Sequence, residues 1–311
     1  MRVSSNSFPD SLVDQLARLT ARQNRLQMQA ATGQRIQLPE DDPAAMQRVL
    51  QLQAESSSLA QYQQNIGSLK DTAVATYDLM KGLQTTSDRA NEIAVLADGT
   101  KSPDDLKAYA TQVTQLIKQA VAQANGQFHG NYLLGGTKND QPPFVIATDA
   151  NGNVTGVTYQ GNTSLAENEI GKGVSLPVGT LGANTSGSGP TGLLADSRTG
   201  ADFFNHLISL QNHLLAGDKD SINTIDRPQL VKDSDNIILQ LSDNATVQGR
   251  LDATGASAKK QSDSLEGLIS AQADADLAQT LVRLNQTQTA YQAALQSGAQ
   301  LLSHSLLDYI R

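Results

Sequence analysis

The amino-acid sequence predicts a mainly α-helical fold with a β-rich insertion. The N- and C-terminal helices are expected to pair as a coiled coil, and further long helices to form a bundle core around a small β domain. Near both ends of the chain, apolar residues recur in alternating steps of four and three, which is the heptad pattern of a coiled coil. Fifteen of the 24 glycines fall between Gly126 and Gly200, a density that disfavours helix in that region.

The first heptad segment begins near residue 12. Its seam positions are Leu12, Leu16, Leu19, Gln23, Leu26, Ala30 and Gly33. The apolar stripe is narrow and has polar flanks, which suits a bundle or an assembly better than a broad globular core. Gln23 is a polar residue on this seam, and such residues lower the stability of coiled coils but help to fix register and partner number.

Two proline-marked helix starts follow. Pro39 disfavours helix at the residue before it, and Asp42–Pro43 places a capping residue before a proline at the first helical position. A long helix from Ala44 to about Leu96 is therefore expected. Ser102–Pro103 repeats the same start, and the helix after it should end near Asn125.

The glycine-rich middle contains two strand-like runs, at 144–148 and 154–159. They flank Asn151–Gly152, which is a strong hairpin signal. Residues 169–178 are expected to add strands, and residues 182–192 to form a flexible loop of small residues.

Helical patterns return at Asp202 and end at Gly217. Two further helices are expected, at 222–241 and 247–268, with Pro228 marking a start or a kink.

The last segment carries the longest heptad seam of the chain. Its positions are Leu277, Leu281, Leu284, Gln288, Tyr291, Leu295, Gly298, Leu302, Ser305 and Tyr309. A sustained seam must be covered by a partner, either the first helix or another copy of the chain. Replacing Leu281 or Leu295 by alanine should cost on the order of 2–5 kcal/mol if this seam is buried.

These elements predict three regions. A terminal coiled-coil region comprises residues 1–40 and 270–311, a helical core comprises 41–137 and 200–269, and a β-rich outer domain comprises 138–199.

Composition argues against several classes of protein. The chain has 311 residues, with 23 basic and 31 acidic side chains and twelve aromatic residues, so nucleic-acid binding is disfavoured. The absence of cysteine excludes disulfides and zinc–thiolate sites. No run approaches the roughly 18 apolar residues of a membrane span, and the N-terminus has no apolar core of signal-peptide length.

No catalytic, cofactor-binding or metal-binding pattern is evident, so the sequence predicts a protein that is not an enzyme. His206 and His213 lack zincin spacing and are expected on a solvated helix surface. The loop after Asp149 lacks the residue order of a calcium-binding loop. The carboxylate pairs Asp41–Asp42 and Asp104–Asp105 lie where helix N-termini favour negative charge, and capping explains both.

Several motifs resemble the bacterial flagellin family. They are Met1-Arg2-Val3-Ser4, Gly33-Gln34-Arg35-Ile36 followed by Asp41-Asp42-Pro43, and the stretch from Asn285 to Ala294. Within that family, Gly130 to Thr137, Pro142-Pro143-Phe144, Tyr159-Gln160-Gly161 and Leu306 to Tyr309 resemble the hook-associated protein 3 branch, which joins hook to filament.

The resemblance implies a structural role in the bacterial flagellum, outside the cell, after type III export without a cleaved signal peptide. It implies contacts with copies of the chain, with a hook-associated protein on the hook side, with flagellin on the filament side and with a cytosolic export chaperone that binds the C-terminal helices. The expected subunit-interface residues are Leu12, Leu16, Leu19, Leu26, Arg35, Ile36, Asp41, Asp42, Leu277, Leu281, Leu284, Tyr291, Leu295, Leu302 and Tyr309.

Three alternatives stay open at this point. The chain could be a flagellin, the filament subunit itself. It could be a secreted coiled-coil adhesin or effector, which would not need matched seams at both ends. A cytosolic enzyme with a helical lid would need clustered polar catalytic residues, and none is evident.

Overall fold

The computed structural model describes residues 7–97 and 100–309, with side chains described for 10–97 and 100–300. The chain divides into two compact units. The terminal unit comprises Met1–Ser58 and Gln261–Arg311, and the central unit comprises Leu59–Lys260. The division into terminal, helical-core and outer regions expected from the sequence stays a prediction.

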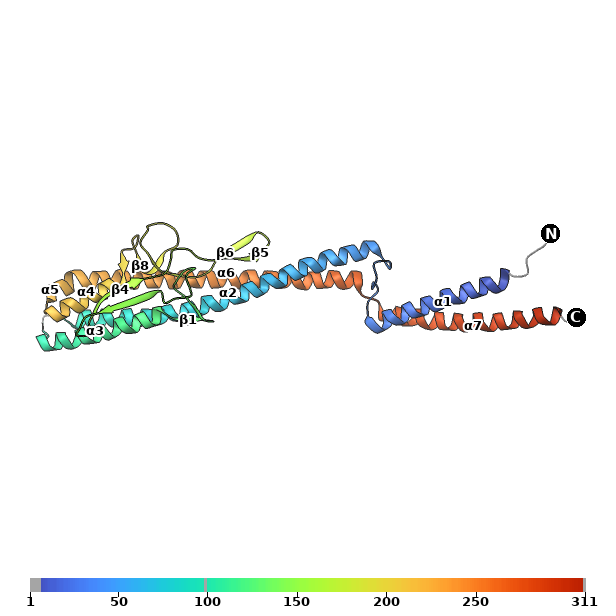
Figure 1. Cartoon of the computed structure of the whole chain (residues 1–311), viewed down its shortest axis with the longest axis horizontal. Coiled ribbons are helices and arrows are strands. Elements are labelled where there is room, and N and C mark those ends of the chain that lie inside the picture. The colour runs from blue at the N-terminus through green and yellow to red at the C-terminus, as the bar shows by residue number, and fades with distance from the viewer. Residues whose placement is uncertain (1–6, 98–99, 310–311) are drawn as a thin grey trace. The chain divides into compact units, whose positions relative to one another are not determined.

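Long helices dominate the described chain, and small β-sheets lie in its middle, so the predicted fold class is confirmed (Figure 1). The helices are α1 (Ser7–Thr32), α2 (Pro43–Leu96), α3 (Pro103–Ala124), α4 (Phe203–Ala216), α5 (Lys219–Ser221), the π-helix η1 (Ile222–Asp226), α6 (Arg227–Ala273) and α7 (Leu277–Tyr309).

The strands form three hairpins and one three-stranded sheet. The hairpins pair β1 (Gln127–Phe128) with β2 (Asn131–Tyr132), β3 (Phe144–Thr148) with β4 (Val154–Tyr159), and β5 (Glu167–Gly171) with β6 (Val174–Pro177). In the three-stranded sheet, β8 (Gly192–Asp196) is parallel to β7 (Leu181–Asn184) and antiparallel to β9 (Ala201–Asp202).

The local signals in the sequence place most helix ends correctly. Ser102 caps α3 in a full capping box, because its hydroxyl accepts from the Asp105 amide and the Asp105 carboxylate accepts from the Ser102 amide. Asn125 ends the same helix, and its side-chain amide exchanges two hydrogen bonds with the Phe144 backbone, which ties the end of α3 to β3. Gly217 ends α4 in the left-handed conformation.

The loop expected at 182–192 is shorter than predicted and comprises residues 185–191. Residues 181–184 form the buried strand β7, and the following turn is held by charge. The Asp196 carboxylate lies 2.9 Å from Nε and 2.6 Å from Nη2 of Arg198, and it also accepts from the Gly192 amide. These hydrogen bonds, the Arg198 guanidinium foremost, outweigh burial and lower the pKa of Asp196 to about 2.

The expected break between 241 and 247 is also wrong, since α6 runs without interruption from Arg227 to Ala273. The irregularity lies earlier, in η1. Pro228 has no amide hydrogen to donate to the preceding turn, and the Arg227 amide bonds to the Ile222 carbonyl five residues back. The proline therefore accounts for a π-helical turn just before it.

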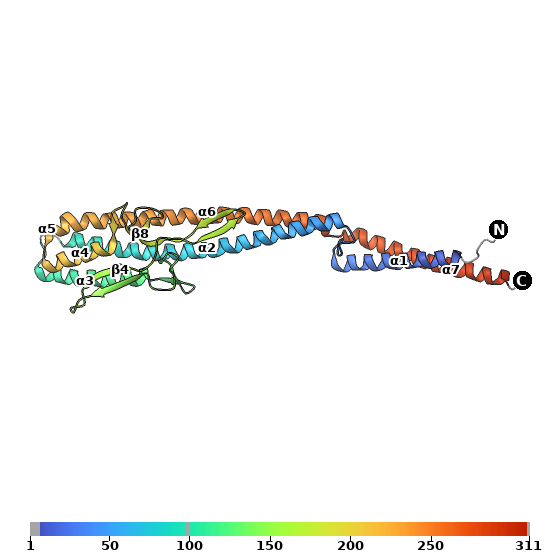
Figure 2. The same ribbon diagram turned by 45° about the horizontal axis from the view of Figure 1, so that its top comes forward.

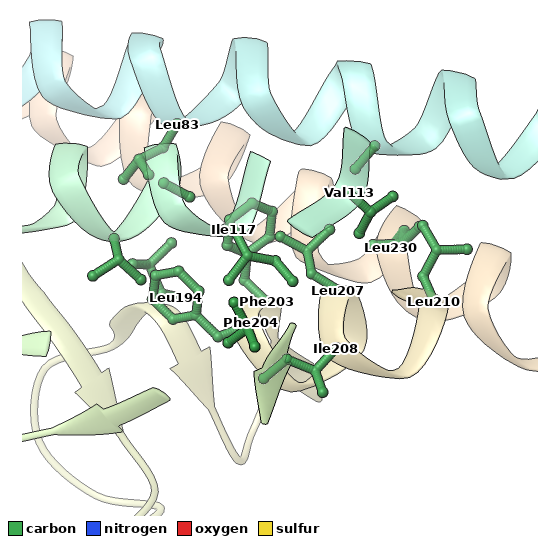
Figure 3. Packing of buried hydrophobic residues seen from close by; sticks show 14 of the residues in the cluster. Leu83, Val113, Ile117, Leu194, Phe203, Phe204, Leu207, Ile208, Leu210 and Leu230 are labelled. Carbon is green, nitrogen blue, oxygen red and sulfur yellow. The ribbon is translucent and has the colours of Figure 1, made fainter. Parts of the chain in front are cut away.

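The central unit contains the main hydrophobic core, shown close up in Figure 3. Its side chains come from α2, α3, α4, α6 and β8 and include Leu83, Ile117, Leu194, Phe203 and Leu230, each at most 1% exposed. A second cluster forms where the β5–β6 hairpin lies along α2 and α6, as Figures 1 and 2 both show, with Ile170 and Leu176 packed against Ile66 and Leu251. Both clusters consist of residues of the central unit.

Candidate functional site

The terminal unit has an incomplete hydrophobic core. Six of its described hydrophobic side chains are buried, namely Leu26, Ile36, Ala45, Val49, Leu265 and Ala273. Nine large hydrophobic side chains of the same unit are exposed, namely Val13, Met28, Leu38, Leu50, Leu268, Leu277, Leu281, Val282 and Leu295. These exposed side chains make the terminal unit the candidate for an association surface.

Helix α1 packs antiparallel against α7 within this unit (Figures 1 and 2). The predicted seam of α1 lies on the packed side. Leu26 is buried, and Leu12, Leu16, Leu19 and Gln23 are half-buried. The heptad pattern of the first segment therefore corresponds to a real contact between the two ends of the chain.

The side of α7 that packs against α1 is not the side predicted from its leucines, although the two sides overlap. The buried and half-buried positions along α7 are Thr280, Leu284, Thr287, Gln288, Tyr291, Ala294 and Gly298. Leu284, Gln288, Tyr291 and Gly298 belong to the predicted seam, whereas Thr280, Thr287 and Ala294 do not. At Gly298 a Cβ atom would overlap the Leu12 side chain, so the absence of a side chain lets the helices approach. The seven-residue spacing of Thr280, Thr287 and Ala294 was a signal for this face, but small residues carry little weight in a hydrophobic pattern.

Three of the four predicted interface leucines of α7 whose side chains are described are about half exposed. Leu277, Leu281 and Leu295 are 49%, 51% and 46% exposed, and we call these three the leucine stripe. The side chains of Leu302 and Tyr309, also expected at the interface, lie outside the described side chains. Among the described residues, contacts within the terminal unit leave about half of each of these side chains exposed, and the role of the leucine stripe in contacts between subunits stays a prediction.

A second feature of the unit is the turn between α1 and α2, which is bonded to the short link between α6 and α7. The Arg35 amide donates to the Ala273 carbonyl at 2.6 Å, and the Ala275 amide donates to the Gly33 carbonyl at 2.7 Å. Arg35 Nη2 reaches the Gln272 carbonyl at 2.7 Å, and Ile36 is buried beside these bonds. We call this set of contacts, over residues 33–42 and 272–276, the elbow.

Two carboxylates organise the elbow. Asp41 accepts from the amides of Gln37 and Leu38 at 3.0 and 3.1 Å and also pairs with Arg25. Asp42 accepts from the Ala45 amide at 3.0 Å and so caps α2. These backbone hydrogen bonds lower the pKa of both carboxyl groups. The expected interface residues Arg35, Ile36, Asp41 and Asp42 thus have structural roles inside the chain, and their role between subunits stays a prediction.

The histidines of α4 are not on a solvated surface, contrary to the expectation from the sequence. His206 Nδ1 lies 2.8 Å from Asp233 Oδ2, and His213 Nδ1 lies 2.7 Å from Asp226 Oδ2. Both carboxylates are buried, and the two pairs join α4 to η1 and α6. Burial favours the neutral ring of His206, but the Asp233 carboxylate outweighs burial and raises the pKa of that histidine. Both pairs hold helices together at the edge of the core.

Within the described residues, no group of three or more histidine, aspartate or glutamate side chains could hold a metal ion. No helix in the same part of the chain is both long enough and apolar enough to cross a membrane.

This architecture is similar to that of known proteins. Residues 3–139 match the family model for the bacterial flagellin N-terminal helical region. No curated protein sequence matches the chain at a significant level.

Three solved structures share the fold. A protein from Vibrio parahaemolyticus assigned as a flagellar hook-associated protein is 19% identical, with a TM-score of 0.63 over 75% of this chain and 99% of its own. FlgL from Bacillus cereus is 18% identical, with a TM-score of 0.55 over 71% of this chain and 99% of its own. The flagellar junction protein FlgL from Legionella pneumophila is 14% identical, with a TM-score of 0.50 over 74% of this chain and 100% of its own.

The family match falls on α1, α2, α3 and the first hairpin, and the fold match extends over most of the chain. The expected resemblance to the flagellin family is confirmed, because residues 3–139 match the model of the flagellin N-terminal helical region and the chain shares its fold with solved hook-associated proteins.

Proposed function

We propose that this chain is a structural subunit of the bacterial flagellum that joins the hook to the filament, by assembling as a ring or layer between them. The observation that carries the proposal is the incomplete core of the terminal unit, in which the leucine stripe of α7 is about half exposed. A helix pair that leaves a regular apolar stripe uncovered is suited to pack against further helices. The fold shared with hook-associated proteins supports the same role.

In this proposal the leucine stripe contacts a neighbouring subunit, and the elbow bonds the turn after α1 to the link before α7. Such contacts join different surfaces of adjacent copies, so repeated around an axis they close into a ring or continue as a helical layer. The side chains of Leu302 and Tyr309 would extend the same interface beyond the described side chains.

The partners follow from the proposed position. Copies of the chain would contact one another, a hook-associated protein would lie on the hook side, and flagellin would lie on the filament side. A cytosolic export chaperone would cover the C-terminal helices before type III export to the extracellular flagellum. The chain would perform no catalysis and require no cofactor, since its role is to match two surfaces.

Deletion of the gene in its own organism tests this function. Hooks without filaments, with flagellin shed into the medium, are the expected result. Loss of the main filament protein with nothing shed would identify the chain as the flagellin instead. Intact filaments and normal swimming would contradict a junction role and favour a secreted adhesin.

Truncation of ten residues from either end separates the adhesin further. An assembly subunit should lose function when either terminal helix is shortened, because both helices form the association surface. An adhesin that does not use paired ends should keep its function.

A further inference from the structure

The terminal unit also carries a second exposed surface, which is basic and points away from the leucine stripe. We infer that an arginine-bearing face of the α1–α7 pair docks on the acidic elbow region of a second copy of this chain. The elbow region comprises residues 33–58 and 261–276, which are the elbow and the adjoining ends of α2 and α6. The inference rests on the proposed assembly role and adds to it a specific contact and its direction.

The face is formed by Arg18, Arg22 and Arg283, which we call the arginine face. Arg18 and Arg22 are four residues apart and therefore lie on one side of α1. The register of the pair follows from the contact of Leu12 with Gly298 and the bridge of Gln34 with Asp274. This register places Arg283 beside the turn of α1 that follows Arg22.

The arginine face and the leucine stripe point in different directions. Leu281 and Arg283 are two residues apart, which is a rotation of about 200° around an α-helix. A neighbour that covers the leucines would therefore leave the arginines accessible to a different neighbour. All three arginines are exposed, and none forms an ion pair with a described residue of its own chain.

The terminal unit also contains the complementary surface. Residues 10–32 and 277–300, which form the α1–α7 pair, contain four basic and two acidic side chains. Residues 33–58 and 261–276, which form the elbow and the adjoining ends of α2 and α6, contain two basic and eight acidic side chains. The two parts therefore carry net charges of +2 and −6, although the whole chain carries −8.

Opposite charge on two parts of one subunit favours contact between the basic part of one copy and the acidic part of the next. Complementary potentials steer association and suppress other orientations. A uniformly acidic partner would be repelled by the elbow region, whereas a second copy offers both signs. We therefore assign the occupant of the arginine face as the elbow region of a second copy, with Glu40 and Asp276 as exposed acceptors.

Carbodiimide coupling tests this assignment, and the acidic residue that is contacted does not have to be known beforehand. Arg22→Lys keeps the charge and introduces an amine that carbodiimide joins to a carboxylate in direct contact. Flagella isolated from cells producing this variant are treated with carbodiimide, and the product with twice the mass of the chain, which contains two copies, is separated by gel electrophoresis. Mass spectrometry of its coupled peptides identifies both partners. Ala21→Lys is the matched control, because it places the same amine about 100° away around α1.

Coupling from position 22 to residues 33–58 or 261–276 in the product with twice the mass of the chain is the expected result, with loss of this product in the control. Coupling only within one copy, coupling to flagellin, or flagella that contain the variant without any such product would overturn the assignment. These results would not contradict the proposed function, because the chain is present in the flagellum. Absence of the chain from flagella would instead contradict the proposed function.

Charge reversal provides a second measurement. Arg22→Glu and Glu40→Arg should each weaken association of copies roughly threefold, as expected for exposed charge pairs. Both changes in one chain should restore association if these two positions face each other. Equal loss in the double variant and in the single variants would assign the effect to folding and reject this pair.

Discussion

Leu281→Ala should separate the stability of the isolated chain from its assembly. Leu281 is 51% exposed in the chain, so about half of its side chain has yet to leave water. Full burial of a leucine side chain stabilises a protein by about 1.5–3 kcal/mol, and burial of the second half on assembly should therefore contribute about 1 kcal/mol per subunit. The truncation should cost the isolated chain less than about 1 kcal/mol, which is well below the cost expected for a buried seam.

Urea unfolding of the purified chain and swimming of the complemented deletion strain measure the two effects. Leu83→Ala is the matched control, because Leu83 is 0% exposed in the central core and its truncation should cost about 2–5 kcal/mol in the isolated chain. Leu281→Met keeps the apolar volume and should keep assembly. A loss of stability for Leu281→Ala as large as that for Leu83→Ala would refute the reasoning, as would unchanged swimming.

Three further predictions concern the central unit. Asp196→Asn should cost about 2 kcal/mol at neutral pH, because the pKa of Asp196 is lowered to about 2 from an ordinary 3.8. The contribution of this carboxylate is present above pH 4 and is lost as the pH falls toward 2, so urea unfolding of the wild type and the variant should converge over that window. Ser102→Ala should cost about 1 kcal/mol through loss of the capping box of α3, and thermal unfolding that matches wild type would contradict this role. Gly192→Ala should cost more than Ser102→Ala, because its Cβ would overlap backbone atoms of β7 and β8, and a soluble variant with unchanged melting temperature would rule the overlap out.

Local signals in the sequence account for most of the secondary structure. The heptads, the Ser102–Pro103 start, the Asn151–Gly152 turn and the stop at Gly217 act through a few neighbouring residues, and all four features appear in the structure. The predictions that failed depend on contacts made outside the segment concerned. Residues 182–192 have the composition of a loop, and the buried carboxylate of Asp196, outside that segment and paired with the exposed Arg198, holds the turn after β7 in place.

The prediction that His206 and His213 lie on a solvated surface failed because each histidine pairs with a carboxylate that is distant in the sequence. His206 and Asp233 are 27 residues apart, and His213 and Asp226 are 13 apart. Only the packing of α4 against η1 and α6 brings each ring to its carboxylate, and the π-helical turn at 222–226 shifts Asp226 relative to a regular helix.

The sequence by itself determined that the two ends of this chain are heptad helices, that their seams are narrow, and that the elbow begins and ends with caps. The tertiary structure alone decided which side of α7 faces α1. Leu284, Tyr291 and Gly298 belong to two overlapping stripes, one completed by leucines and the other by Thr280, Thr287 and Ala294. The choice between these stripes depends on how closely the two helices approach and at what angle they cross, and neither quantity is encoded in one helix alone. Small residues permit the closer approach, so they face α1 and the leucines are left for another surface.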